Sequence, residues 1–483
     1  MDEQSRTTLK LDLASITDFQ KEFHYGRKLK DGNSDPEDPV DSRFSYEFNK
    51  STWSAHIVEK MQASNQNKSI IYRPSNKYDF LFGCTMRAII PQIKIAPKWR
   101  GKIRIRWTRN LGHHIFKKAN LKLDSNIVGT LTPQWLDARA SRYESRPHIY
   151  NRMIGETPKL NSWSEERLPG FLLNIPQPWF YTKDTYLALP ILGCSMNVIE
   201  HEYEFRLSIA KLLQVQGRAN KESDDWQPIE FQNQYIEGNP EIPIPELWGR
   251  FAQVMNDERE WHRQPPSTYM IEDIVTASPE NIVREGKCAT ITLSASLPCK
   301  AYFWMAQNGK ADKYNNYSNY TTDPFDLDFG WNPCKNTIIK YKGADQPRAE
   351  FTDDQSEFSD LYDFYPGGGT QPGYNSCTNC YDVETFHSEP GVVPLNVAAT
   401  MVIQIDETNP YNFDESPTIV DEVDEDGNPI PPEFAPKNDK KTKNEYNVFV
   451  IMLVTKKLEF RHHAERDKIE YKVVDTALPI DKK

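Results

Sequence analysis

The segment Asn197–Ile209 alternates apolar and polar side chains along most of its length. One set of alternate positions is mainly apolar: Ile199, His201, Tyr203, Phe205, Leu207 and Ile209. After Val198, the positions between them are polar or charged: Glu200, Glu202, Glu204, Arg206 and Ser208. Because successive side chains of a strand point to opposite faces, the pattern predicts one long strand with a buried face and a wet face. Such strands are typical of antiparallel sheets.

Similar apolar runs of strand length recur in two groups. The first group comprises 78–82, 85–95, 101–108, 114–123, 171–175, 186–192, 198–213 and 247–255. The second comprises 269–277, 288–296, 301–307, 336–341, 397–405, 446–453, 457–461 and 469–474. Short helices are predicted only near Pro133–Tyr143 and Asp353–Tyr362, because no stretch carries a sustained helical apolar stripe. The irregular strand spacing and long loops favour jelly rolls over propellers.

The chain of 483 residues is too long for one ordinary core. A charged connector with paired prolines separates the two groups of strands, which predicts two β-sandwiches of similar size in tandem. The polar segment 214–245 is predicted to lack strands. The predicted division is an N-terminal arm 1–44, a first unit 45–256, a connector 257–268, a second unit 269–475 with an acidic loop insertion 406–445, and a C-terminal tail 476–483.

The net charge is −11, which makes the chain a poor non-specific binder of nucleic acid. One local exception is the basic stretch Lys98–Arg109, in which most cations alternate with Ile103, Ile105 and Trp107. This alternation predicts the wet face of a strand, and a contact with phosphate or protein is the alternative interpretation.

Seven cysteines are scattered in mostly apolar contexts, and no apolar N-terminal segment resembles a signal peptide. We therefore expect free, mostly buried thiols in a reducing compartment. Glycosylation sequons occur at Asn49, Asn67, Asn316 and Asn319. They are interpreted as chance matches that nevertheless mark surface loops.

The candidate metal motifs are incomplete. Cys377-x-x-Cys380 with His387 lacks a second pair of ligands. The adjacent pairs His113–His114 and His462–His463 would point to opposite faces of a strand and could not chelate one ion. No metal site and no cofactor are predicted.

Other motifs also fail on their context. The stretch from Glu422 to Glu433 has EF-hand spacing but contains three prolines, so a solvated acidic loop is preferred to weak calcium binding. Asp326-Leu-Asp328 is interpreted as a loop carboxylate pair, and Gly367–Gly369 is not followed by a phosphate-binding pattern. No catalytic residue is predicted, so a structural protein is favoured over an enzyme.

Aromatic residues crowd two segments that are predicted to be loops. They are Tyr314, Tyr317, Tyr320, Phe325, Phe329 and Trp331, then Tyr362, Phe364, Tyr365 and Tyr374. Because large rigid aromatics concentrate binding energy, we interpret them as interface anchors of a subunit that assembles. A sugar-binding platform is the alternative.

Five blocks of the sequence, in this order, resemble the major capsid proteins of nucleocytoplasmic large DNA viruses. The blocks are Trp107–Leu121 with Gln134–Leu136; Ile175–Asp184 with Leu187–Pro190 and the strand 197–209; Asp257–Arg259 with Tyr269–Asp273; Ala301–Gln307; and Asn447–Met452. The resemblance covers roughly 44–474. The arm lacks the family's usual apolar opening, the insertion 406–445 is unusual, and 214–245 and 366–394 match poorly.

The resemblance implies an all-β fold of two tandem eight-stranded antiparallel jelly rolls with long loops and a few short helices. It implies a structural subunit of an icosahedral capsid that self-assembles into pseudo-hexagonal homotrimers in the host cytoplasm. The implied partners are further copies, minor capsid and penton proteins and an internal membrane-associated layer, without direct nucleic-acid contact. A carbohydrate-binding or carbohydrate-active β-sandwich protein, and a minor capsid or scaffold paralogue, are the alternatives.

Overall fold

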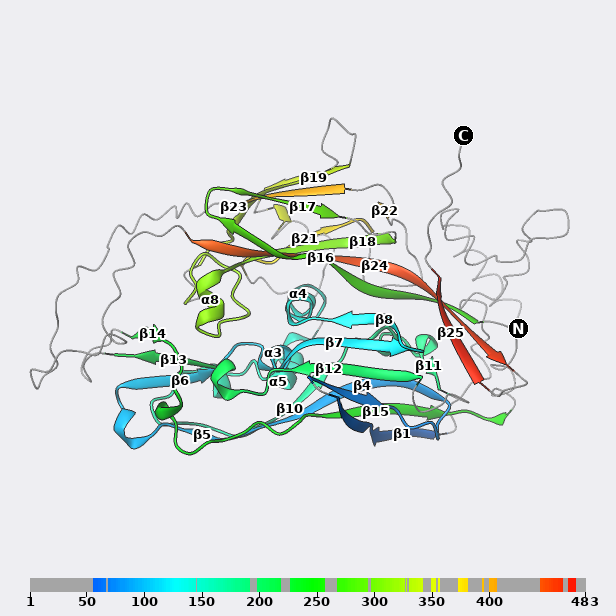
Figure 1. The fold of residues 1–483 in the computed structure, drawn as a ribbon, viewed down its shortest axis with the longest axis horizontal. Helices are drawn as coiled ribbons and strands as arrows, with labels where there is room; N and C mark the ends of the chain where they lie inside the picture. Colours follow the sequence, from blue (N-terminus) through cyan, green and yellow to red (C-terminus); the bar gives the residue numbers. More distant parts are fainter. Residues whose placement is uncertain are drawn as a thin grey trace, which may run out of the picture.

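The computed structural model describes residues 55–474, with gaps at 67, 145, 192–197, 219–225, 257–266, 294–296, 326, 328–329, 342–348, 353–354, 357–371, 381–392, 395–398, 406–443 and 464–467. The strand pairs of its sheets are all antiparallel across these described ranges. The sheets form two units, and most strands of both units run along the long axis of the molecule (Figure 1).

The first unit contains four sheets whose strands all precede residue 254. Two five-stranded sheets have the orders β1-β15-β4-β10, with β11 on β4, and β2-β3-β12-β7-β8; the smaller sheets are β14-β13-β6 and β5-β9. The strands are β1 (Ala55–Lys60), β2 (Gln62–Gln66), β3 (Ser69–Arg73), β4 (Phe80–Ile90), β5 (Ile93–Lys94), β6 (Ile103–Trp107), β7 (Phe116–Leu123), β8 (Asn126–Leu131), β9 (Arg167–Leu168), β10 (Phe171–Pro176), β11 (Leu189–Pro190), β12 (Ile199–Phe205), β13 (Leu213–Gly217), β14 (Gln227–Ile229) and β15 (Glu246–Gln253).

The second unit contains two sheets, ordered β16-β24-β18-β21 with β22 and β25 at the side, and β17-β23-β19-β20. Its strands are β16 (Ser267–Arg284), β17 (Cys288–Leu293), β18 (Pro298–Asn308), β19 (Cys334–Tyr341), β20 (Ala349–Thr352), β21 (Asn375–Thr378), β22 (Val393–Pro394), β23 (Ala399–Ile405), β24 (Glu445–His463) and β25 (Lys468–Val474). Two strands expected at 446–453 and 457–461 are one long strand, because β24 pairs with β16 along nearly its whole length.

Short helices lie in the connections of both units. They are α3 (Leu111–His114), α4 (Pro133–Tyr143), α5 (Pro147–Ile154), α6 (Pro158–Asn161) and α8 (Gly309–Lys313), with 3-10 turns η1 (Pro97–Trp99), η2 (Phe180–Thr182), η3 (Thr185–Leu187), η4 (Ile209–Lys211) and η5 (Asn233–Tyr235). The predicted helix Pro133–Tyr143 is confirmed as α4, and the Thr132 hydroxyl caps its start by accepting from the backbone amide of Trp135. None of the helices in the described ranges is long and apolar enough to span a membrane.

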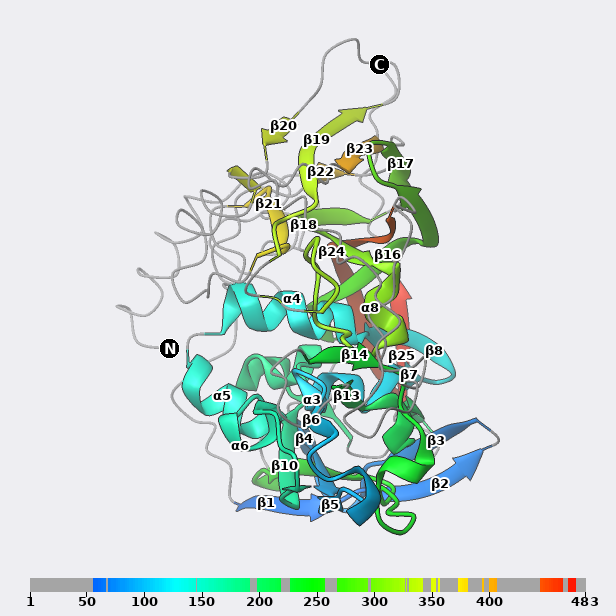
Figure 2. The same cartoon turned by 90° about the vertical axis from the view of Figure 1, so that its left-hand side faces the viewer.

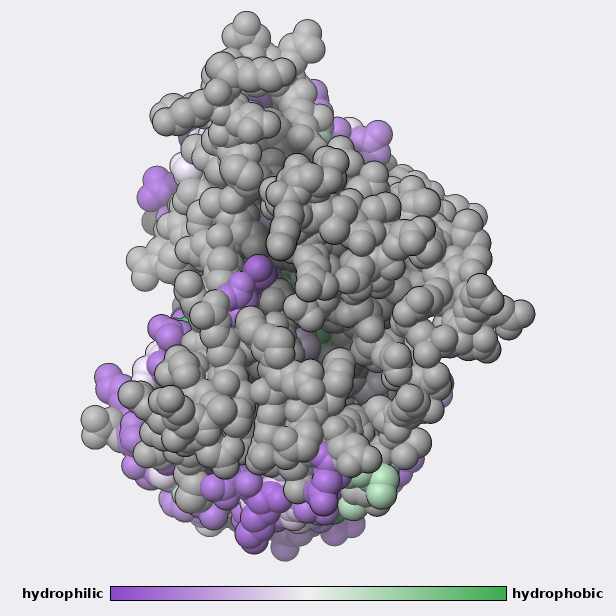
Figure 3. Space-filling model, turned by 90° about the vertical axis from the view of Figure 1, so that its right-hand side faces the viewer, coloured by the Kyte–Doolittle hydropathy of each residue, from purple (hydrophilic) through white to green (hydrophobic). Residues whose placement is uncertain are grey.

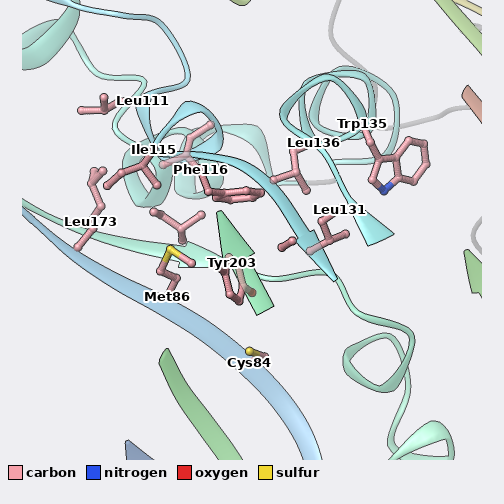
Figure 4. Packing of buried hydrophobic residues seen from close by; sticks show 14 of the residues in the cluster. Cys84, Met86, Leu111, Ile115, Phe116, Leu131, Trp135, Leu136, Leu173 and Tyr203 are labelled. Carbon is pink, nitrogen blue, oxygen red and sulfur yellow. The ribbon is translucent and has the colours of Figure 1, made fainter. Parts of the chain in front are cut away.

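The core of the first unit is filled from both large sheets. Figure 4 shows Met86 of β4, Phe116 of β7 and Tyr203 of β12 converging between them. The rings of Phe116 and Tyr203 meet edge to face, with centroids 5.5 Å apart. On the outside, the described surface at the bottom of Figure 3 is mostly hydrophilic, as the alternating strands require.

The long strand predicted over 197–209, and its extension to 213, is wrong in its second half. β12 ends at Phe205, where the pairing with β7 shifts by one residue. The Arg206 amide then donates to the carbonyl of Ile115, the turn η4 follows, and the chain joins a different sheet as β13. The apolar alternation continues past the end of β12 into the turn η4, where Ile209 is also buried.

Other predictions need similar correction. The strand expected over 186–192 is the turn η3 followed by the two-residue strand β11, and the segment 214–245 contains β13 and β14. The strand expected from His114 begins only at Phe116, because α3 precedes it. Several predictions concern segments outside the described residues. These segments are the N-terminal arm, the C-terminal tail, Gly367–Gly369, both carboxylates of 326–328, the EF-hand-like stretch 422–433 and His387. Nearly all of the connector and of the acidic insertion, and most of the helix expected at 353–362, also lie outside them.

Candidate functional site: the junction between the two units

An apolar junction joins the two units into one body. The central strand β18 is buried at every position, so it lacks the alternation of a half-exposed strand. Ala301, Phe303 and Met305 face the core of the first unit. Tyr302, Trp304 and Ala306 face the second sheet of their own unit. The β16-β24-β18 sheet is therefore sandwiched between the two units.

Helix α4 fills the space between this sheet and the first unit (Figure 2). The Trp135 ring lies 5.3 Å from the ring of Phe303, centroid to centroid, and Tyr143 packs against the same phenylalanine at 5.9 Å. Arg142, which is buried, donates to the backbone carbonyls of Tyr374 and Ser356 in the second unit. α4 thus contacts the second unit through both apolar and polar groups.

A buried carboxylate is the centre of the polar part of the junction. Oδ1 of Asp137 accepts from Asn110 at 2.9 Å and from Nδ1 of His113 at 2.6 Å. Its Oδ2 lies 3.2 Å from Nε2 of His114 and 3.3 Å from the hydroxyl of Tyr320 in the second unit. Four donors therefore surround one carboxylate, and one of them crosses between the units.

The ionisation of this cluster follows from its burial and its neighbours. Burial alone would raise the pKa of Asp137, but His114 and His113 hold it below its ordinary value. Burial lowers the pKa of His114, against the opposing influence of Asp137. At neutral pH Asp137 is therefore an ionised carboxylate and His114 is a neutral partner, and a buried, fully hydrogen-bonded network of this kind specifies geometry.

The segment Asn315–Thr321 inserts from the second unit into the first. The Asn315 side-chain amide donates to the carbonyls of Ala210 and Leu213 at 2.8 and 2.7 Å. The backbone carbonyl of Asn315 accepts from the hydroxyl of Thr108 at 2.8 Å and from the side-chain amide of Gln214 at 3.1 Å. Ser318 lies 2.7 Å from Nε2 of His114. Backbone and side-chain groups of this segment are thus satisfied by the first unit.

The surface position expected for two of the sequons is wrong. Asn316 is 4% exposed and Asn319 is 1% exposed. Their side-chain amides donate to the carbonyls of Pro324 and Asp323 within the same loop. Because the nitrogen that would carry a glycan is buried and bonded, neither asparagine is a glycosylation site in the folded chain. Asn49 and Asn67 lie outside the described residues.

A second polar contact crosses the junction nearer to the start of β16. Glu272 is buried and receives hydrogen bonds from Lys183 of the first unit and Lys300 of the second. Burial would raise the pKa of Glu272, but the two ammonium groups lower it to about 2. The neighbouring Asp273 accepts from the backbone amide of Thr130 at 2.8 Å, which ties β16 to β8. Removal of one partner from such a buried pair would leave an uncompensated buried charge, which is strongly destabilising.

The aromatic residues expected as interface anchors divide into two sets. Tyr317, Tyr320 and Tyr374 are buried inside the chain, so they serve the junction between the units rather than a surface. Their burial also excludes them from a sugar-binding platform. Phe325 and Trp331 are exposed by 36% and 39% and keep the surface position that was predicted. Phe329, Tyr362, Phe364 and Tyr365 lie outside the described residues.

The reasoning about the first histidine pair is wrong in its geometry. His113 and His114 lie in α3, not in a strand, and both rings reach Asp137. A search of the described residues finds no group of three or more His, Cys, Asp or Glu that could hold a metal ion. The side chains of His462 and His463 are outside the described set. The prediction of mostly buried cysteine thiols without disulfides is confirmed for the described cysteines: Cys84, Cys299, Cys334, Cys377 and Cys380 are buried, and Cys288 is exposed.

The basic stretch forms an alternating stack of arginine and tryptophan on the β14-β13-β6 sheet, which we call the arginine–tryptophan ladder: Arg106, Trp163, Arg104, Trp226 and Arg218. The Trp163 ring lies 4.3 Å from the guanidinium of Arg106 and 5.1 Å from that of Arg104. The wet face predicted for this strand is confirmed, since both arginines are half-buried between the buried Ile103, Ile105 and Trp107.

Comparison with known proteins identifies the class of molecule. The family model described as "Major capsid protein N-terminus" matches residues 42–251. The major capsid protein of Wiseana iridescent virus is 24% identical over 375 residues, covering 74% of each chain. That of Lymphocystis disease virus 1 is 24% identical over 412 residues, covering 80% of this chain and 84% of the relative.

Solved structures agree in fold. The Faustovirus major capsid protein superposes with a TM-score of 0.62 at 9% identity, covering 95% of this chain and 99% of that one. The capsid protein in the quasi-atomic model of the PBCV-1 virus capsid superposes with a TM-score of 0.58 at 13% identity, covering 89% and 99%. The all-β prediction of two tandem jelly rolls is confirmed. Residues 42–251 match the major capsid protein family, the chain is similar over most of its length to major capsid proteins of large DNA viruses, and it is a structural, non-enzymatic subunit of an icosahedral virus capsid.

Proposed function

We propose that three copies of this chain form a pseudo-hexagonal capsomer. The observation that carries the proposal is the junction, in which an apolar sheet face, α4 and the Asp137 cluster hold the two units as one body. A protomer with two fixed units of similar construction presents two comparable lateral faces. Three such protomers give a near six-fold outline, and cyclic symmetry closes the assembly without runaway growth.

The predicted division of the chain belongs to the same proposal. The first jelly roll would comprise 45–256 and the second 269–475, with the connector 257–268 between them. This is supported by the sheets, because no sheet in the described ranges mixes strands from before residue 254 with strands from after residue 266. The arm 1–44, the insertion 406–445 and the tail 476–483 would then be the segments that distinguish this subunit from a bare pair of barrels.

The wider partners follow from the role of a shell subunit. Capsomers would contact further capsomers, minor capsid proteins and penton proteins, and the inner side of the shell would face a membrane-associated layer. Assembly would take place in the host cytoplasm. The acidic net charge of −11 supports a shell that does not contact nucleic acid directly.

Size-exclusion chromatography with light scattering tests the capsomer. The expected mass is about three times the 56.0 kDa of one chain, and negative-stain images should show particles of hexagonal outline. The measurement should be repeated across a hundredfold range of protein concentration. A mass that stays at one chain at the highest concentration would refute the proposal.

A further inference from the structure

The two units share one strand order. The sheet β1-β15-β4-β10, with β11 on β4, corresponds to the sheet β16-β24-β18-β21, with β22 on β18. The strands β3-β12-β7-β8 correspond in the same way to β17-β23-β19-β20. Corresponding strands also follow one another in the same order along the chain. A surface that one unit uses for contact therefore has a counterpart at the same place on the other unit.

The junction joins unlike surfaces of the two units. The second unit contributes the outer face of its β16-β24-β18-β21 sheet, from which Phe303 packs on Trp135 of α4. The first unit contributes the side that carries β8, where the Thr130 amide donates to Asp273, together with α4 and α3. The contact is therefore head to tail. Its two counterparts, the outer face of the β1-β15-β4-β10 sheet and the β20 side of the second unit, lie at opposite ends of the molecule (Figure 2).

The outer face of the β1-β15-β4-β10 sheet carries exposed apolar side chains. Val58 of β1 is 57% exposed, Ile89 of β4 is 58% exposed and Leu172 of β10 is 39% exposed. Ile89 and Leu172 lie directly opposite each other in the strand register. Met86 and Leu173, from the same two strands, point the other way into the core. Several large apolar groups on one outer face are typical of a surface that a partner covers.

The same face has an excess of positive charge. Lys60 pairs with Glu246 at 2.7 Å, and Arg87 is attracted to the same carboxylate. Arg250 has no ion pair with any residue of the described ranges, and its stem passes over Gly83, where an added Cβ would lie 2.8 Å from it. Three cations therefore share one carboxylate on a chain whose net charge is −11. A partner surface with an acidic side chain would complement them.

The β20 side of the second unit offers matching groups. Trp331 lies just before β19, as α3 lies just before β7, and it is 39% exposed. Glu350 of β20 is also exposed and lies opposite Ile338 of β19. Tryptophan is enriched among the residues that carry most of the binding energy of interfaces. The second unit thus has an aromatic anchor and an acidic group in the region that corresponds to the first unit's side of the junction.

We infer that the outer face of the β1-β15-β4-β10 sheet binds the second unit of another copy of this chain, on the side that carries Trp331 and Glu350. The inference rests on the proposed capsomer and names the surfaces through which its copies meet. The contact repeats between copies the head-to-tail arrangement that the junction makes within one copy. Repetition of one contact through all the units gives the near six-fold outline, and the ring closes after three copies.

The difference between the corresponding strands β18 and β4 agrees with a contact between separate chains. β18 is buried at every position, whereas the second half of β4 alternates, with Arg87 and Ile89 exposed. The junction forms while one chain folds, so its sheet face can be wholly apolar. A face that stays in water until a second copy arrives must keep charged groups among its apolar ones, and interfaces between separately folded chains have this mixed composition.

Thiol labelling of cysteine variants tests which face is covered. V58C, I89C, L172C and W331C are treated with N-ethylmaleimide in the assembled full chain and at a dilution at which the chain is monomeric. Mass spectrometry of peptides then gives the rate at each position. Each introduced thiol should react at least about tenfold more slowly in the assembled chain, because the centre of an interface excludes water. I282C is the control, at a position of β16 that is 65% exposed, and its rate should be equal in both states.

Charge and apolar variants test the energetic role of the face. I89E/L172E and R87E/R250E should each raise the protein concentration at half-assembly at least about tenfold. K117E/K118E makes the same change of charge on exposed lysines of β7 and should alter that concentration less than about twofold. E350K should recover part of the assembly lost in R87E/R250E. Below the assembly concentration, each variant should keep the unfolding midpoint of the parent chain, which separates loss of assembly from loss of folding.

The outcomes distinguish the two proposals. Equal labelling rates at positions 58, 89 and 172 in trimer and monomer would overturn the inference, as would normal assembly of both face variants. Slow labelling in both states would show that another part of the same chain, such as the arm 1–44, covers the face, and would also overturn it. A trimer with fully reactive thiols contradicts this inference alone. A lasting monomer at the highest concentration contradicts the capsomer itself and, with it, this contact.

Discussion

Replacement of Asp137 by asparagine tests whether the buried carboxylate holds the two units together. The substitution keeps the size of the side chain but replaces one acceptor oxygen by a nitrogen with two hydrogens. Oδ1 receives Asn110 and His113, and Oδ2 receives His114 and Tyr320. Whichever oxygen is replaced, two donors then face another donor in a buried site.

The magnitude follows from these unsatisfied groups. A buried donor without an acceptor costs about 1–3 kcal/mol. Two such donors cost about 2–6 kcal/mol, and rotation of the Tyr320 hydroxyl or a change of histidine tautomer relieves part of it. We expect D137N to be destabilised by about 3 kcal/mol, which corresponds to a roughly hundredfold larger population of the open junction.

Hydrogen exchange resolved by segment is the suitable assay, because the loss should concentrate where Tyr320 and Ser318 meet the first unit. Amides of Asn315–Thr321 should exchange about a hundredfold faster in D137N at pH 7. The control is D124N, at an exposed turn residue whose φ of 48° asparagine tolerates, and it should change stability by less than about 0.5 kcal/mol. Native exchange rates at Asn315–Thr321 in D137N would refute the assignment of this carboxylate as the polar centre of the junction.

Two further perturbations test the junction and the core. Gly373 has a φ of 89°, and a Cβ there would clash with the carbonyl of Tyr320, so G373A should cost more than about 3 kcal/mol in urea unfolding. Gly286 is the control: it has a φ of 72° with open space around it, and G286A should cost only about 1 kcal/mol. Equal losses of unfolding free energy in G373A and G286A would contradict the predicted clash. His201 is buried beside Tyr181, and burial lowers its pKa to about 3, below the 6.5 of the unfolded chain. Between pH 3 and pH 6.5 the His201 side chain therefore binds a proton in the unfolded state but not in the folded state. The contribution of His201 to stability is present above pH 6.5 and is lost as the pH falls toward 3. H201Q should reduce the slope of unfolding free energy against pH in that window by about 1.4 kcal/mol per unit, and an unchanged slope would contradict the assignment.

Local physics accounts for the parts of the fold that the sequence predicted. The strands at 288–293 and 399–405 alternate because one face of each is buried and the other is wet, and neighbouring positions alone reveal this. α4 was also visible locally, since Thr132 and Pro133 form a typical helix start. Both faces of β18 are buried, so the sequence shows only a run of apolar residues there. The run predicts a strand, but it does not predict which two cores the strand contacts.

The candidate site could not be read in the same way. Tyr320 and Asp137 are 183 residues apart in sequence, as are Asp273 and Lys456, and no period links such pairs. The tyrosines at 317, 320 and 374 have the composition of surface anchors, and only the docking of the second unit turned them inward. His113 and His114 were assigned to opposite faces because the helix α3 between two strands was not foreseen.

Local patterning alone shows that this chain is built from amphipathic strands in two groups, because alternation is a property of neighbouring residues and each group can bury its own apolar face. Packing of the sheets selects which buried faces meet: it places β18 between two cores, surrounds the Asp137 carboxylate with donors from both units, and covers two sequons. The physical reason is that these contacts join groups far apart in the chain, and their partners are fixed only when whole sheets pack.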